Sequence, residues 1–400
     1  NDPPGQPSPK GTTMSILTAP AITAAEAVRR IEAVSRRVQQ PASSGDLVSL
    51  AVGEPDFTTP APIVEAAAAA LRDGWTHYAP LKGDPQLRFA LADQVGTLLG
   101  RPANPDHIQV THGGSAGLAS AILGLIDPGD VVVLPDPTYS LYADLIAMAG
   151  GRAVHVPLAD DLHWDLDALT SALTGARMFV FCNPSNPTGI VHTRAELEAL
   201  GDALDGTDTL VLTDEAYADL VFTSAPFVSA LEVPSLAERT IYCQPFSKSY
   251  AMTGWRLGYP WGPPAVIEAA GRVHASFMGS PNTFVQRAGL VALSDCADEV
   301  AGMREAYRRR QRLMYDELRV VTGLQVQPPE GAFYLFPRYD APIGSIELVG
   351  YLRSHGVAVR PGAEFGKHGE HHLRLSCAAS DEHIITGVHR LADALTQITG

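Results

Sequence analysis

The chain carries a lysine whose surroundings could support covalent chemistry. Lys248 lies in the string Ser-Lys-Ser-Tyr-Ala-Met-Thr-Gly-Trp-Arg-Leu-Gly-Tyr, which begins at Ser247. A lysine amine can form a Schiff base with an aldehyde and, once displaced, can transfer protons. Eight residues later, Arg256 offers a guanidinium whose planar fork suits a phosphate better than an ammonium does. A lone lysine in a loop is usually a solvated surface residue, so this interpretation depends on the whole string.

A second candidate is the carboxylate of Asp214, which follows the apolar run Leu210–Thr213. A charged carboxylate at the end of a buried strand is costly unless a cation pairs with it. The position therefore predicts a cationic partner, although an aspartate here could also cap the next helix. Tyr217 follows three residues later and adds a hydroxyl donor to the same segment.

Two loops follow predicted strands. Residues 183–189 read Asn-Pro-Ser-Asn-Pro-Thr-Gly, at the carboxyl end of a strand, where open α/β sheets bind ligands. Residues 111–117 read Thr-His-Gly-Gly-Ser-Ala-Gly and lead into an apolar helix. Backbone amides at that helix start and the hydroxyl of Ser115 suit a phosphate. A glycine loop also fits a dinucleotide-binding fold, but the Gly-x-Gly-x-x-Gly fingerprint of that fold is absent.

Together these segments resemble the class I and II aminotransferases, which are pyridoxal-phosphate enzymes of fold-type I. The resemblance extends from about Leu50 to Ser380, with every motif in order. It implies that Lys248 carries the cofactor as a Schiff base and moves the substrate proton. It also implies that Asp214 pairs with the pyridine nitrogen and that Tyr217 donates to the phenolic oxygen. The other cofactor contacts that it implies are Gly114, Ser115, Ala116, Tyr139, Asn186, Ser247, Arg256 and Tyr78.

The resemblance also implies contacts with the substrate and with a second subunit. Arg374, in Leu-Arg-Leu-Ser, and Asn186 would bind the substrate carboxylate, for which a bidentate guanidinium is the natural partner. Gly53 would let the N-terminal segment close over the substrate, because it has no side chain. Tyr78 would reach the phosphate of the neighbouring subunit, which implies a homodimer with active sites at its interface.

The chain departs from the family pattern in one visible place. Three residues before the lysine, where many relatives carry a phosphate-binding serine, this chain has Pro245. Ser247 and Ser115 must then share the phosphate contacts, or Arg256 and backbone amides must supply more of them.

The implied activity is transfer of an amino group from an L-amino acid to a 2-oxo acid by a ping-pong mechanism. Carbon–sulfur lyases, cyclopropane-forming synthases and amino-acid cyclases remain alternatives, because they share these cofactor residues. A non-catalytic amino-acid sensor usually needs a DNA-binding domain, for which the stretch before Gly53 is too short. Aspartate-preferring bacterial relatives often carry a lysine at the position of Ser115, so its absence favours neutral or aromatic amino acids.

The elements that must position these residues alternate between helices and short apolar runs from Thr58 to about Ser294. Such alternation predicts a mostly parallel sheet with right-handed crossovers. We expect an α/β fold, with a large domain (58–295) whose sheet is sandwiched by helices. A smaller α+β domain would be built from both chain ends, namely 14–57, which also forms an N-terminal arm, and 296–400. Residues 1–13 would be a disordered extension or a non-native remnant. The predicted strands of the large domain are Ile108–Thr111, Val131–Leu134, Ala153–Pro157, Met178–Phe181, Leu210–Thr213, Thr240–Cys243 and Gly258–Trp261.

Composition narrows the function classes. The 400 residues are 46% hydrophobic and carry a formal net charge of -15, which argues against a nucleic-acid partner. The four cysteines have neither disulfide nor metal-ligand spacing, so we expect a reducing cytoplasm and no metal. No apolar run approaches the roughly 18 residues that a membrane helix needs, so no membrane partner is expected.

Overall fold

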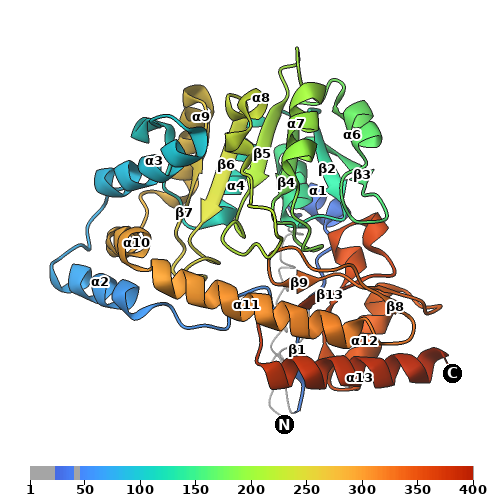
Figure 1. Ribbon diagram of the computed structural model, residues 1–400. Helices are drawn as coiled ribbons and strands as arrows, with labels where there is room; N and C mark the ends of the chain where they lie inside the picture. Colours follow the sequence, from blue (N-terminus) through green and yellow to red (C-terminus); the bar gives the residue numbers. More distant parts are fainter. Residues whose placement is uncertain (1–22, 40–45, 400) are drawn as a thin grey trace, which may run out of the picture.

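A computed structural model describes residues 23–39 and 46–399 of the chain, so the expected extension at 1–13 lies outside the described residues. A six-stranded sheet forms the centre of the larger part (Figure 1). Its first five strands run parallel and the last is antiparallel, which confirms the mostly parallel sheet. In spatial order the strands are β3 (Arg152–Pro157), β2 (Val131–Asp136), β4 (Met178–Cys182), β5 (Leu210–Asp214), β6 (Thr240–Pro245) and β7 (Gly258–Trp261).

The prediction of a regular strand at Ile108–Thr111 is wrong. The segment follows a short 3-10 helix, η1 (Pro105–His107), and runs antiparallel to β7 with isolated bridges at its two ends. Between them the Gln109 amide donates to the carbonyl of Pro260 over 3.1 Å. Proline has no N–H to return that bond, so a continuous ladder cannot form.

The central strands are apolar almost throughout because helices cover both faces of the sheet (Figure 1). Neighbouring residues of a strand point to opposite faces. In β4, Met178 and Val180 pack in one hydrophobic cluster with residues of α4 and α5, whereas Phe179 and Phe181 pack in another with residues of α6, α7 and α8. These helices are α4 (Gly114–Leu125), α5 (Leu141–Ala149), α6 (Leu166–Leu173), α7 (Arg194–Ala203) and α8 (Pro234–Ala237), and α8 follows the 3-10 helix η2 (Ala230–Glu232).

The smaller part joins the two ends of the chain. Strand β1 (Val48–Ser49) pairs in parallel with β11 (Val357–Ala358). A three-stranded antiparallel sheet lies beside them, in the order β12 (Arg360–Pro361), β13 (Leu373–Ser376) and β9 (Tyr334–Leu335). This pairing confirms an α+β unit built from both chain ends. Its other elements are β8 (Leu324–Gln325), β10 (Arg338–Tyr339), α12 (Ser345–Ser354), α13 (Asp381–Thr399) and the 3-10 helices η3 (Gly362–Phe365) and η4 (Lys367–Gly369).

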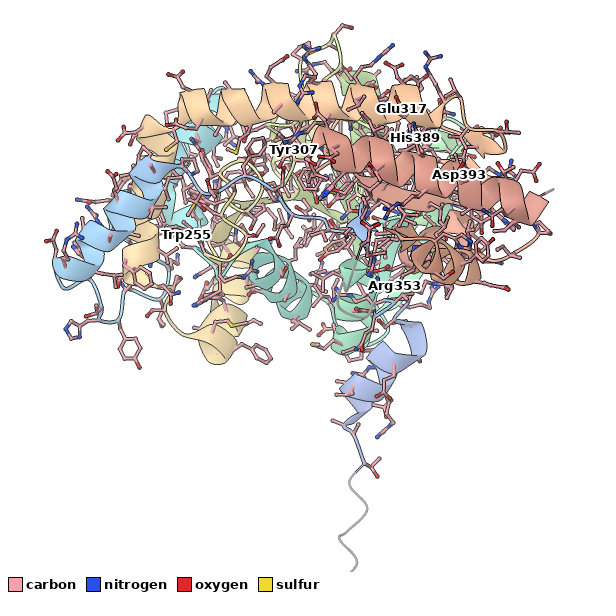
Figure 2. All side chains as sticks on the ribbon, turned by 90° about the horizontal axis from the view of Figure 1, so that it is seen from below. Trp255, Tyr307, Glu317, Arg353, His389 and Asp393 are labelled. Atoms are coloured by element: carbon pink, nitrogen blue, oxygen red, sulfur yellow. The ribbon has the colours of Figure 1, made fainter. Side chains whose placement is uncertain are left out.

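The long helix α11 (Ala297–Leu318) crosses below the sheet and reaches the smaller part (Figure 1). Figure 2 shows α11 beside α13, where His389 on α13 lies 3.2 Å from the carboxylate of Glu317.

None of the helices in the described ranges combines the length and apolar character needed to cross a bilayer. The remaining helices are α1 (Glu26–Val34), α2 (Ala61–Arg72), α3 (Pro85–Leu99), α9 (Pro264–Met278) and α10 (Thr283–Asp295).

Candidate active site

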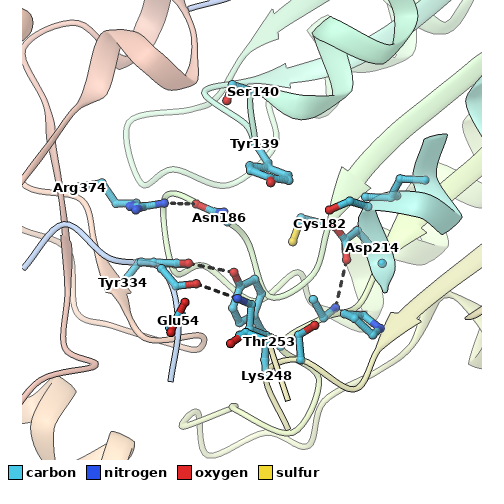
Figure 3. Close-up of a pocket in the computed structure, with 18 of the residues that line it drawn as sticks. Glu54, Tyr139, Ser140, Cys182, Asn186, Asp214, Lys248, Thr253, Tyr334 and Arg374 are labelled. Carbon is cyan, nitrogen blue, oxygen red and sulfur yellow. Dashed lines mark hydrogen bonds between the residues drawn. The ribbon is translucent and has the colours of Figure 1, made fainter. Parts of the chain in front are cut away.

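A cavity of about 660 Å³ lies at the carboxyl ends of β2, β4 and β5 and extends to the three-stranded sheet of the smaller part (Figure 3). Parallel strands bring the loops at their carboxyl ends together at one edge of the sheet, which is why motifs far apart in sequence meet here. The site residues proposed from sequence that line the cavity are Gly53, Gly114, Ser115, Tyr139, Asn186, Asp214, Tyr217, Ser247, Lys248, Arg256 and Arg374.

Lys248 lies in the segment that follows β6, and its amine points into this cavity (Figure 3). The Nζ atom donates a hydrogen bond of 2.7 Å to the carbonyl oxygen of Gly53. Burial lowers the pKa of Lys248 to about 8, although the nearby carboxylate of Glu54 opposes the shift. A larger fraction of the amine is therefore neutral near pH 7 than for an exposed lysine, which suits a nucleophile.

Asp214 is the last residue of β5 and is buried. Its Oδ2 accepts a 2.9 Å hydrogen bond from the Tyr142 hydroxyl, and its Oδ1 accepts one of 3.3 Å from the Ala216 amide. Burial raises the pKa of Asp214 to about 6. Within residues 23–39 and 46–399 the carboxylate has no ion-pair partner, so it can still pair with a cation that enters the cavity. Tyr142 lies within α5, in no motif, and no sequence signal singled it out.

The start of α4 lines another end of the cavity, where it offers backbone amides as well as side-chain hydroxyls. Ser115 is exposed to the cavity and Ser247 is buried beside it, so two hydroxyls line this end. The first amides of a helix have no partner within the helix and attract anions. Pro245 also lines the cavity, and a Cβ on Gly114 would lie 3.2 Å from its Cβ. The proline therefore packs against the helix start without adding a donor.

Arg256 adds a cation to the same end of the cavity. Its Nη1 donates to the carbonyl of Thr253 over 2.8 Å, which leaves other guanidinium N–H groups for a ligand. A Cβ on Gly113 would lie only 2.6 Å from Nη2 of Arg256. Gly113 also has φ +78°, a conformation that favours glycine, so the glycine permits the guanidinium to approach the start of α4.

Arg374 lies on β13 and is buried between two aromatic rings. Its guanidinium is 4.4 Å from the ring centre of Tyr334 and 4.9 Å from that of Phe365. It donates to the side-chain oxygen of Asn186 over 3.2 Å and to the carbonyl of Ala51 over 2.8 Å. The buried Nε has no partner in the described part of the chain. A fixed, incompletely bonded guanidinium is suited to bind a carboxylate.

Two tyrosine hydroxyls meet between Lys248 and Arg374. The hydroxyl of Tyr217 lies 2.9 Å from that of Tyr334, and both side chains are buried. A Cβ on Gly53 would lie 2.5 Å from the Tyr334 hydroxyl oxygen, so glycine is required where the N-terminal segment crosses the cavity. Tyr334 was not identified from the sequence, because it lies in a short strand outside the motifs.

Two of the proposed cofactor contacts lie outside the cavity. Ala116 is buried within α4, one residue beyond Ser115. Tyr78 is 96% exposed and lines a separate cavity of about 580 Å³ beside Trp75. The sequence reasoning also missed Arg360 and Glu364, which line the active-site cavity from β12 and η3.

A second charged cluster lies away from the cavity, where α7 begins. The Nδ1 atoms of His163 and His192 lie 2.9 Å and 3.2 Å from the same Glu196 oxygen. These three side chains could also hold a metal ion, since their ligand atoms lie within 4.8 Å of one another. Hydrogen bonds to Glu196 and Glu330 raise the pKa of His163 to about 10. Burial raises the pKa of Glu196, but the histidine hydrogen bonds outweigh it and lower that pKa.

The chain is similar over most of its length to known aminotransferases. The family model of aminotransferase class I and II matches residues 45–391. An aspartate aminotransferase of Pyrococcus horikoshii is 34% identical over 357 residues, covering 88% of this chain and 91% of that protein. An aspartate/prephenate aminotransferase of Cereibacter sphaeroides is 35% identical over 368 residues, covering 88% and 92%.

Solved structures agree as well. An aromatic aminotransferase from Pyrococcus horikoshii matches with a TM-score of 0.86 and 34% identity, over 93% of this chain and 99% of that one. The Thermus thermophilus aspartate aminotransferase with maleate matches with a TM-score of 0.82 and 34% identity, over 93% and 97%. The chain therefore belongs to the class I and II aminotransferases, the fold-type I enzymes that use pyridoxal phosphate.

Proposed function

We propose that the protein transfers the amino group of an L-amino acid to a 2-oxo acid in a ping-pong cycle at this cavity. The observation that carries the proposal is that Lys248 and Arg374 line the same cavity from different parts of the fold. Lys248 follows β6 of the large sheet, whereas Arg374 lies on β13 of the smaller part. An amine that moves a proton and a guanidinium that binds a carboxylate are the two groups that an amino-acid substrate requires.

The residues of the cavity fit pyridoxal phosphate. The carboxylate of Asp214 is available for a cationic pyridine nitrogen, and the ring of Tyr139 can stack on the cofactor. The start of α4, together with Ser115, Ser247 and Arg256, can hold the phosphate. When bound, the cofactor supplies an electron sink for cleavage of the bond between Cα and its hydrogen.

The protein's own groups then have separate tasks. Lys248 would anchor the cofactor and, when free, would move the proton at Cα of the substrate. Arg374 and Asn186 would orient the substrate through its carboxylate, while the Tyr217 hydroxyl would donate to the cofactor. The negative charge of Asp214 would favour a protonated pyridine nitrogen.

The N-terminal segment closes the cavity over the substrate. Its Gly53 carbonyl accepts from Lys248, and its Ala51 carbonyl accepts from Arg374, so one short segment contacts both functional cations. Such a segment excludes water and holds the guanidinium in place. We also propose that residues 58–295 form the large domain, and that residues 14–57 and 296–400 form the arm and the smaller domain.

We further propose a homodimer in which Tyr78 reaches the phosphate site of the partner subunit. Support comes from the exposure of its whole side chain and from the large exposed side chains around it. Measurement of molar mass by light scattering should give twice the mass of the chain, and Tyr78→Phe should weaken cofactor binding. The exposed large apolar side chains of α2, α3, their connecting loop and α9 are Val64, Leu71, Trp75, Tyr78, Leu81, Phe89, Phe277 and Met278.

A cytoplasmic location is also part of the proposal. It fits the free cysteines of the described residues, because a reducing compartment keeps thiols reduced.

The test is a set of half-reactions in which the holoenzyme is mixed with each of the twenty amino acids without an oxo acid. We expect at least one to convert the bound cofactor to its amine form and release the matching 2-oxo acid. Release of ammonia or a thiol instead would indicate a lyase, and ligand binding without any product would indicate a sensor.

A further inference from the structure

We propose that the ion pair between Arg360 and Glu364 recognises the substrate side chain and selects an uncharged carboxamide over a carboxylate. The inference rests on the proposed function and names the substrate class for that same site. Both side chains line the active-site cavity, Arg360 from β12 and Glu364 from η3.

The register of the small sheet places this pair beside the arginine that binds the α-carboxylate. Arg360 and Arg374 are directly opposite each other in the antiparallel pairing of β12 with β13. Directly opposite residues of an antiparallel pair project to the same face of the sheet, and like charges there are destabilising. Each guanidinium therefore needs its own partners. Arg374 has Asn186 and the Ala51 carbonyl, whereas Arg360 has Glu364.

Glu364 removes the positive charge that a side-chain carboxylate would require. Four cations line the cavity within the described ranges, and Lys248, Arg256 and Arg374 already serve the cofactor, the phosphate and the α-carboxylate. The fourth, Arg360, is in a salt bridge with Glu364, and the exposed fractions of the two side chains are only 19% and 7%. A second substrate carboxylate would meet a neutral pair whose glutamate repels it.

The pair nevertheless keeps unused hydrogen-bonding capacity of both kinds. Oε2 of Glu364 is buried and has no hydrogen-bond partner within the described residues. Arg360 donates to Glu364 through Nη2, which leaves further N–H groups of the guanidinium. A carboxamide has an oxygen for Arg360 and an NH₂ group for Glu364, so it satisfies both sides without adding charge.

The experiment compares amides with the matching acids. Wild-type and Glu364→Gln holoenzymes are reacted with glutamine, glutamate, asparagine and aspartate in single half-reactions followed by cofactor absorbance. We expect the wild type to react faster with each amide than with its acid. Glu364→Gln keeps the shape but removes the charge, and should raise the acid-to-amide ratio of kcat/KM by at least about tenfold. Glu364→Asp keeps the charge and should retain the preference for amides.

Binding provides a readout that does not require turnover. Calorimetry with unreactive succinate and its monoamide, succinamate, should show tighter binding of the monoamide to the wild type and loss of that preference in Glu364→Gln. Glu268→Gln is the matched control, because Glu268 forms an exposed pair with Arg272 at the same four-residue spacing. It should leave both ratios unchanged.

Two results would overturn the inference. The first is an acid-to-amide ratio that stays within about twofold of wild type in Glu364→Gln. The second is a wild type that prefers acids and loses that preference in Arg360→Gln, which would make Arg360 a carboxylate receptor from which the substrate displaces Glu364. Either result leaves the proposed transaminase function intact, provided that the wild-type enzyme converts at least one amino acid to its 2-oxo acid. A wild-type enzyme that converts none of the twenty amino acids would refute the proposed function itself.

Discussion

Two groups of charged side chains in this molecule, one buried in the active-site cavity and one half-buried at the start of α7, differ in how far the protein itself satisfies their hydrogen bonds. In the active-site cavity, Asp214 has no ion-pair partner within the described residues, and the Nε of Arg374 is likewise without a partner. In the cluster at the start of α7, Glu196 instead accepts from two histidines and from Thr193. The first group retains capacity for a ligand, whereas the second is satisfied by the protein itself.

The difference shows how a functional charge can be separated from a structural one. A buried charge without sufficient partners destabilises the fold, so it persists where a ligand completes it. A half-buried charge with several partners stabilises the elements it joins, as Glu196 does by capping α7 and bonding His163. Changes in the cavity should therefore affect activity most, and changes in the cluster should affect stability most.

The largest expected effect is that of Lys248→Ala. Removing the amine removes both the proposed cofactor anchor and the proposed proton carrier, so transamination should fall at least about a thousand-fold. The measurement is the half-reaction rate together with the visible absorbance of the bound cofactor. Lys367→Ala changes an exposed lysine of η4 and should leave both unchanged. Full activity of Lys248→Ala would refute the assignment.

A somewhat smaller loss is expected for Asp214→Asn, which keeps the shape of the side chain but removes its charge. Without that charge the pyridine nitrogen loses its proton more readily, so kcat should fall about 100-fold or more. Because burial raises the pKa of Asp214 to about 6 in the protein without cofactor, wild-type cofactor affinity should fall as pH decreases through 6. The variant should lack this dependence, which spectroscopic titration between pH 5 and 8 would detect.

Arg374→Lys should mainly weaken substrate binding. An ammonium keeps the charge but cannot form the bidentate contact, so KM should rise by about 10-fold to 100-fold, with a smaller change in kcat. Steady-state kinetics over a wide substrate range separates the two constants. An unchanged KM would show that the α-carboxylate is bound elsewhere.

The smallest effect on activity, and a clear effect on stability, is expected for His163→Gln. Hydrogen bonds between charged groups contribute about 2 kcal/mol, so the free energy of unfolding should fall by about that amount. The pKa of His163 is raised from 6.5 to about 10, so its stabilisation is complete below pH 6.5 and is lost as pH rises through 10. The pKa of Glu196 is lowered from 4.5, so its stabilisation is lost as pH falls.

The difference between wild type and His163→Gln should therefore be largest between about pH 4.5 and 6.5, as measured by urea unfolding. His389→Gln removes the partner of Glu317 from a pair between α11 and α13 in which the histidine side chain is 63% exposed (Figure 2). It should change stability by less than about 0.5 kcal/mol, because solvent screens exposed pairs. Equal effects of the two variants would show that the cluster stabilises the fold no more than an exposed pair does.

Much of the fold was predictable because continuous apolar runs indicate strands covered on both faces. Most predicted strands of the central sheet appear at nearly the predicted residues, and β4 differs by one residue. The prediction of a strand at Ile108–Thr111 was wrong because the segment would have to pair with Pro260 of β7, which has no N–H. The sequence of the segment does not reveal which residue will lie opposite it.

Residue types, short-range spacing and the resemblance that they carry were sufficient to predict the chemistry of the site. Lys248, Asp214 and Arg374 are recognisable because their roles depend on functional groups and on the local motifs that hold them. Folding alone decided which distant side chains accompany them, since hydrogen bonds such as Tyr142 to Asp214 depend on three-dimensional packing. The pairing of β12 with β13 likewise placed Arg360 and Glu364 beside Arg374, because strand register is a tertiary property.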